Sequence, residues 1–170
     1  MALSAFLKLK GQKQGDIKGS VTQTTGNRKD KIQVIAVSHE VVSPRDPASG
    51  LPTGKRMHKP FVITKELDKS SPLLYTVLCT NENIPEWELQ FWTPQLSAAS
   101  GVGAEKQHYT IKLTNANIAS ISFRMLNNKN PELTRYTEFE EVAFTYQKIE
   151  WTWMDGGISA SDDWEAAVTG

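Results

Sequence analysis

The 170-residue sequence lacks several features that identify common classes of protein. Cys79 is the single cysteine, so we expect no internal disulfide, and synthesis in a reducing compartment. No apolar run approaches the roughly 18 to 20 residues that cross a bilayer, so we predict no membrane insertion. The apolar start of the chain carries Lys8 and Lys10 within it and has no small-residue cleavage site after it. A secretory signal peptide is therefore not expected, and an exported protein would need another route.

Catalytic and metal-binding motifs are also scarce. His39, His58 and His108 are scattered without metal-ligand spacing. The run Gly50–Lys55 is one residue too short for a phosphate-binding loop. The pair Asp162–Asp163 lies in a small-residue tail that does not position it for acid and base chemistry. We therefore predict a protein that is not an enzyme and that has no catalytic residues, no cofactor and no metal.

The zero net charge conceals a gradient along the chain. Residues 1–60 carry eleven Lys and Arg against four Asp and Glu, whereas residues 136–170 carry one Lys against eight acids. The basic part has almost no aromatic residues to stack on bases, so nucleic-acid binding is not expected. The opposite charges can attract a second copy of the chain, or they can mix within one fold and leave no polarity.

Short alternating apolar patterns predict a mainly β protein. A long β-branched stretch at 31–43 predicts one long strand. The apolar positions change phase between Tyr146 and Ile149, which predicts a bulge or a transfer to another sheet. The other expected strands lie near residues 5–9, 61–67, 87–91, 109–113 and 118–125. The last two can form one continuous ribbon with a bend or bulge at 114–117.

One segment reads clearly as a helix. Ser71 is expected to cap it, Pro72 suits the first helical position, and four apolar residues follow on one face. The predicted helix covers about 72–80. With about eight short strands, the fold class is a compact β-barrel or sandwich of antiparallel sheets with one short flanking helix.

A long connection at about 43–60 interrupts these strands. Its sequence contains four Pro, two Gly and five Lys, Arg or His residues. Connections of this length without structure of their own are uncommon in compact domains unless they bind something. We expect an extended loop that projects from the fold, the alternative being a tolerated mobile loop.

Four runs of residues resemble one known family. They are Gly54–Leu74 (GKRMHKPFVITKELDKSSPLL), Lys112–Ile118 (KLTNANI), Tyr146–Thr152 (YQKIEWT) and the late Asp162–Trp164. Together they resemble the haemolysin-coregulated protein (Hcp) family, the tube subunit of bacterial type VI secretion. The most specific part is the basic His and Pro-Phe run that leads into the helix start.

The resemblance implies a single β-barrel domain over residues 1–170 with a short C-terminal tail. It implies homohexameric rings that stack into a hollow tube, with sheath, spike and effector proteins as partners. It also implies synthesis in the bacterial cytoplasm and export by type VI secretion, with the 43–60 loop reaching neighbouring subunits and the adjacent ring.

Candidate contact residues follow from the loop and the charge gradient. The basic side of a subunit or ring interface is expected to involve Arg45, Lys55, Arg56 or Lys59, and the acidic side Glu138, Glu140, Asp155 or Asp162. Asp46, Leu51 and His58 of the loop are further candidates for the same interface. Small polar residues that can face a lumen, or equally ordinary solvent, are Ser38, Ser120 and Ser122.

Two other functions remain open. The first is a β-sandwich module that binds a ligand such as carbohydrate through the loop and surface Trp residues. The second is a small hydrolase that depends on one of the histidines.

Overall fold

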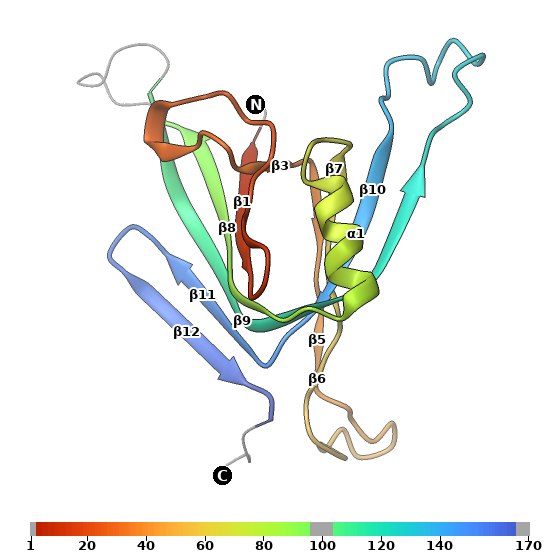
Figure 1. Cartoon of the computed structure of the whole chain (residues 1–170). Coiled ribbons are helices and arrows are strands. Elements are labelled where there is room, and N and C mark those ends of the chain that lie inside the picture. Colours follow the sequence, from red (N-terminus) through yellow and green to blue (C-terminus); the bar gives the residue numbers. More distant parts are fainter. Residues whose placement is uncertain (1–2, 96–103, 166–170) are drawn as a thin grey trace.

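The computed structural model describes residues 3–95 and 104–165. It contains twelve strands, one α-helix and one 3-10 turn in the described part, and Figure 1 shows their arrangement. The strands are β1 (Ser4–Gly11), β2 (Gly15–Ile17), β3 (Ile32–Val34), β4 (Ala36–Ser38), β5 (Val41–Val42), β6 (Met57–His58), β7 (Phe61–Glu66), β8 (Ile84–Pro94), β9 (Glu105–Arg124), β10 (Phe139–Thr145), β11 (Lys148–Trp153) and β12 (Ile158–Asp163). The 3-10 turn covers Thr25–Asn27 and the helix α1 covers Ser71–Thr80. The predicted mainly β, antiparallel class with one helix is confirmed.

Strand β9 is the common element of the sheet. Its first half pairs with β8 on one side and β11 on the other, and its second half pairs with β10. Asn115 has a left-handed φ of 51° between the two halves. Asparagine tolerates this conformation better than most residues, so the ribbon bends without ending. The prediction of a bend within one ribbon is confirmed.

The stretch predicted as one strand over 31–43 forms three short strands. β3 pairs with β1, β4 pairs with β7, and β5 pairs with β6. The β-branched sequence favours extended backbone throughout, and the chain changes its partner strand twice. Residues 32–38 pair with β1 through β3 and with β7 through β4, so this segment links two strands that lie near opposite ends of the pairing path. The predicted barrel stays a prediction.

The phase change after Tyr146 marks a change of partner. β10 lies between β7 and the second half of β9, whereas β11 pairs with the first half of β9 and with β12. The prediction of a transfer is confirmed. β12 was not expected, because the sequence indicated an unstructured tail there; residues 166–170 of that tail lie outside the described residues.

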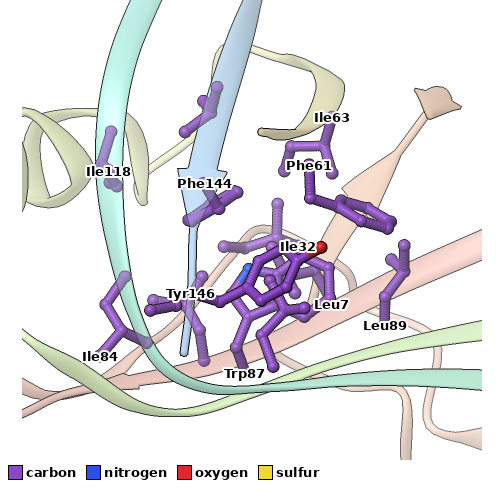
Figure 2. Close-up of a cluster of buried hydrophobic side chains, with 14 of the residues drawn as sticks. Leu7, Ile32, Phe61, Ile63, Ile84, Trp87, Leu89, Ile118, Phe144 and Tyr146 are labelled. Atoms are coloured by element: carbon purple, nitrogen blue, oxygen red, sulfur yellow. The ribbon is translucent and has the colours of Figure 1, made fainter. Parts of the chain in front are cut away.

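The core is built on aromatic contacts between strands. Trp87 of β8 is 2% exposed and meets Phe61 and Phe144 edge-on, with ring centroids 5.1 and 5.4 Å away. Edge-to-face contacts of this kind add to the free energy gained by burying the rings. Figure 2 shows these rings among the aliphatic side chains of the core, with Leu7 and Leu89 from β1 and β8.

Helix α1 starts one residue earlier than predicted. The N-cap position is Ser70, and Ser71 is the first helical residue. The Ser71 hydroxyl accepts hydrogen bonds from the Asp68 backbone N–H and from Lys65 Nζ, so it organises the turn before the helix. The helix buries Leu74 and Val77 against the core.

A buried ion pair joins β7 to β10 below this turn. Lys65 Nζ lies 2.6 Å from Glu140 Oε1, and both side chains are fully buried. The same ammonium lies 3.1 Å from Asp68 Oδ1 and donates to the Glu66 carbonyl at 2.9 Å. The ammonium thus holds two strands and the helix start together.

Candidate subunit-contact site

The extended loop has an ordered tip. The backbone N–H of Asp46 donates to the Leu51 carbonyl at 2.9 Å, and Arg45 pairs with Pro52. The Asp46 carboxylate accepts hydrogen bonds from the backbone N–H and the hydroxyl of Ser49 at 3.0 and 2.5 Å. These contacts close a small hairpin that presents Leu51, which is 65% exposed, to solvent. Figure 1 shows the loop extending past the strands at the end of the molecule where β5 and β6 lie.

The root of the loop is held by a chain of polar contacts, which we call the anchor: Arg56, His58, Asp162, Tyr146 and His39. Asp162 accepts a bidentate contact from the Arg56 guanidinium, whose Nη2 to Oδ1 distance is 2.7 Å. His58 Nε2 lies 2.6 Å from Asp162 Oδ2. The Tyr146 hydroxyl lies 2.8 Å from His58 Nδ1 and 2.7 Å from His39 Nε2. The anchor thus connects the residues flanking β5 and β6 to β12.

Burial and charge set the protonation of the anchor. The hydrogen bond and charge of Arg56, with the contact to His58, lower the pKa of Asp162 although burial opposes this. Burial, helped by His58, lowers the pKa of His39. Burial, with the charge of Asp162, raises the pKa of Tyr146, so its hydroxyl stays protonated at neutral pH. The resting anchor therefore contains a carboxylate, a phenol and a neutral His39.

Trp164 covers this anchor from the C-terminal side. Its indole N–H donates to the Tyr146 carbonyl, and its ring centroid lies 6.1 Å from that of His58. The His58 side chain is only 2% exposed. The His58 part of the anchor is therefore shielded from water, whereas the Arg56–Asp162 pair is partly exposed.

The described residues show neither a metal cluster nor a membrane helix. Among residues 3–95 and 104–165, no three His, Cys, Asp or Glu side chains are placed to hold a metal ion. No helix in the same part of the chain has the length and apolar character needed to cross a membrane.

Comparison with known proteins decides the family. The family model described as "Type VI secretion system effector, Hcp" matches residues 6–153. A protein of Pseudomonas aeruginosa called "Major exported protein" is 41% identical over 177 aligned positions that cover both chains completely. The chain belongs to the Hcp family.

Solved structures of Hcp proteins agree with this assignment. A crystal structure described as that of an Hcp protein is 34% identical and has a TM-score of 0.85, covering 98% of this chain and all of that one. The structure of "Secreted protein Hcp3" from Pseudomonas aeruginosa is 35% identical with a TM-score of 0.73, covering 97% of this chain and all of that one. The comparisons thus support the type VI secretion family and the β-rich fold.

The structure brings some of the predicted interface residues of this Hcp chain together in one subunit. Arg56 and Asp162 were expected on the basic and acidic sides of an interface, and both side chains stay partly exposed, so that expectation stays a prediction. They contact each other within the chain, because β12 folds back beside the loop root. The charge gradient, which runs from a net charge of +7 over residues 1–60 to −7 over residues 136–170, is thus partly neutralised inside the fold.

Glu140 requires a correction. It was expected on an acidic surface, but it is fully buried and paired with Lys65. It lies at a core-facing position of β10, and the sequence pattern did not reveal its partner. Of the other candidates, Asp46 is half-buried and the His58 side chain is buried in the anchor. The exposed ones are Arg45, Leu51, Lys55, Lys59, Glu138 and Asp155, and Lys59 pairs with Glu40 at 2.9 Å.

The three serines expected at a lumen are all exposed. Ser38 lies in β4, while Ser120 and Ser122 lie in the second half of β9. The pairing of β9 with β10 and of β10 with β7 places all three in one continuous part of the sheet. Their exposure suits a lumen and ordinary solvent equally, so the assignment stays a prediction.

Two anchor residues, His39 and Tyr146, are absent from the interface candidates that the sequence predicts. Tyr146 continues the apolar alternation of Val142 and Phe144, which indicates a buried position, and it is 5% exposed. The signal available was its hydroxyl, because a buried tyrosine usually needs a hydrogen-bond partner.

We predict that Asp162→Asn destabilises the protein by about 1 to 2 kcal/mol at neutral pH, since it weakens two charge-assisted contacts that are partly exposed. The lowered pKa of Asp162 means that its contribution is present above the ordinary carboxyl value of 3.8 and is lost as pH falls below it. Urea unfolding at pH 7 and pH 3 measures this. Equal differences between wild type and variant at both pH values would contradict the prediction.

Proposed function

We propose that this chain is a structural subunit of the type VI secretion inner tube. In this proposal it forms hexameric rings that stack into a hollow tube, is made in the cytoplasm and leaves by type VI secretion. It works with sheath and spike proteins, carries effectors in its lumen and catalyses no reaction. The residues 1–170 act as one Hcp-like domain.

The observation that carries the proposal is the family match over residues 6–153 on a fold that also has an ordered projecting loop. A closed ring needs a heterologous contact between two different surfaces of one subunit. The loop tip with Leu51 supplies a protruding surface of this kind, and the anchor fixes its direction.

The alternative of a carbohydrate-type binding module has less support. Trp87 and Trp92 are buried, so they cannot stack on a sugar. Trp153 and Trp164 are exposed at 45% and 36%, and they lie at opposite ends of the β11–β12 hairpin, too far apart for one stacking platform. A hydrolase would need a nucleophile beside His39 or His58, whereas the group bound there is a phenol of raised pKa.

Negative-stain microscopy of the purified protein tests the proposal. A six-fold ring with a central hole is expected, and a stable monomer at micromolar concentration would overturn it.

We also predict that salt dissolves tubes before it dissolves rings. The screening length falls from about 10 Å at 0.1 M salt to about 3 Å at 1 M. Single exposed ion pairs contribute about 0.2 to 1 kcal/mol, but a contact between rings repeats each of them six times. Sedimentation of assembled tubes over this salt range measures the effect. Tubes that keep their length, or rings that dissociate first, would contradict polar stacking.

A further inference from the structure

We propose that the anchor holds at most one proton beyond its resting state, and that a second proton opens the root of the extended loop. The opening itself does not depend on the proposed function, whereas its consequence for ring stacking does.

The resting chain of hydrogen bonds runs in one direction. Asp162 is ionised and can only accept, so His58 Nε2 carries the proton that faces it at 2.6 Å. A neutral His58 then has a bare Nδ1, which accepts from the Tyr146 hydroxyl at 2.8 Å. The Tyr146 oxygen in turn accepts from His39 Nε2 at 2.7 Å. Each donor in this assigned tautomer faces one acceptor.

One additional proton can be accommodated by reversing these bonds. With His58 protonated, its Nδ1 donates to the Tyr146 oxygen, and the phenol proton turns to His39 Nε2. His39 then keeps its proton on Nδ1. The positive charge lies against Asp162, so the pairing with β12 is preserved.

A second proton cannot be accommodated. Both His39 Nε2 and His58 Nδ1 then donate to the one Tyr146 oxygen, and the phenol proton loses both of its acceptors. Two positive charges also lie within about 5.5 Å of each other through that oxygen. Burial already disfavours the charged form of His39, which packs on the Phe61 ring with centroids 4.9 Å apart.

The surrounding charges do not remove this conflict. Arg56 adds positive charge on the Asp162 side and occupies both carboxylate oxygens, so Asp162 cannot turn to His39. Asp163 accepts from Gln147 Nε2 at 3.3 Å, and its carbonyl accepts from Arg56. The Glu40–Lys59 pair next to His39 is exposed and balanced.

A surface pocket beside Trp164 is lined by Arg56 and His58 of the anchor and also by Lys55 and Glu165, which carry opposite charges. No described residue therefore offers a protonated His39 a carboxylate that is not already paired with another group.

The loop root depends on the two histidines. His58 lies in β6, and His39 lies two residues before β5. Val41 pairs with His58, Val42 pairs with Met57, and the Lys59 N–H donates to the Glu40 carbonyl at 3.0 Å. Repulsion between the histidines therefore acts directly on this short two-stranded sheet, and the loop beyond it loses its fixed direction.

Amide hydrogen exchange of the full chain tests the proposal. We expect the protection factors of residues 41–42 and 57–59 to fall by about tenfold or more between about pH 7.5 and about pH 5, a tenfold change corresponding to one unit of pKa. Protection factors remove the intrinsic pH dependence of exchange. The amide of Leu89, in the core strand β8, is the internal reference and should not change.

Two variants separate the roles of the anchor residues. His39→Gln keeps a donor and an acceptor for Tyr146 but cannot take a proton, so the root should stay protected at both pH values. Tyr146→Phe removes the shared oxygen, so the root should be poorly protected at both. Two matched controls, His108→Gln and Tyr136→Phe, lie outside the anchor and should respond like wild type.

The outcomes decide the proposal. An unchanged wild-type root between the two pH values, or a tenfold response that survives in His39→Gln, would overturn it. If Tyr146→Phe also lowers the protection of Leu89, the fold is damaged, and the wild type and His39→Gln alone decide. Sedimentation of tubes at both pH values is a separate measurement. If the root opens while tubes persist, the proton-limited anchor is supported and loop-mediated stacking is contradicted.

Discussion

Shortening the extended loop is expected to abolish tubes while leaving the subunit folded. Replacing Pro47–Thr53 with Asn-Gly removes Leu51 and the ordered tip but keeps Arg56 and His58 in the anchor. A shorter loop changes the closure entropy little, so the free energy of unfolding should stay within about 1 kcal/mol of wild type. We expect rings, if they form, to fail to stack, with the tube population falling by at least about tenfold.

Size-exclusion chromatography, circular dichroism and sedimentation together test this result. A matched variant keeps the seven-residue length but replaces Leu51 with Ser. If Leu51 makes the contact between rings, the Leu51→Ser variant should lose tubes almost as completely as the variant with the shortened loop. Tubes of wild-type length in the shortened variant would show that the loop has no role in assembly. Loss of circular dichroism would show instead that the loop belongs to the core of the fold.

The second large effect is expected at the buried Lys65–Glu140 pair. Lys65→Met leaves a carboxylate buried without its partner, because no described residue other than Lys65 donates to Glu140 Oε1 and none donates to Oε2. Breaking a buried pair in this way typically costs about 3 to 5 kcal/mol. That is a large fraction of the roughly 5 to 15 kcal/mol by which domains are stable. Urea unfolding should show a lower midpoint at unchanged slope.

The double variant Lys65→Met/Glu140→Leu distinguishes charge from packing. It removes both charges and should recover most of the loss, since buried pairs are often replaceable by apolar residues of similar volume. Lys112→Met, at an exposed pair 3.9 Å from Glu88, is the control and should change stability by no more than about 0.5 kcal/mol. A double variant as unstable as the single one would mean that Lys65 acts through its contacts with the helix start.

The sequence predicts those parts of the fold that local patterns determine. The alternation of Trp87, Leu89 and Phe91 predicts a strand with one buried face, and Ser-Pro before an apolar face predicts the helix. The 43–60 loop is predicted because Pro and Gly exclude regular structure there. These signals depend only on neighbouring residues.

Partner choice could not be predicted in the same way. The run at 31–43 favours extended backbone in every residue, yet nothing in it specifies that the chain leaves β1 for β7 at Ile35. Similarly, Arg56, His58 and Asp162 were nominated as candidates, but their meeting in one subunit depends on β12 folding back. Contacts between residues more than a hundred positions apart are decided by the whole fold.

The pairing of strands that lie far apart in the sequence also has a consequence for synthesis on the ribosome. β1 cannot pair with β8 until residues near Leu89 have been synthesised, because Leu7 pairs with Leu89. In the same way β7 cannot pair with β10 until Val142 has been synthesised, because Ile63 pairs with Val142. The anchor forms later still, since Asp162 follows the other four anchor residues in the sequence. Folding with such distant pairings is slow compared with helix bundles, and its unpaired strands are exposed meanwhile. In a growing chain the loop root therefore stays without its anchor until β12 has been synthesised, and a contact that needs the loop in its fixed direction cannot form before then.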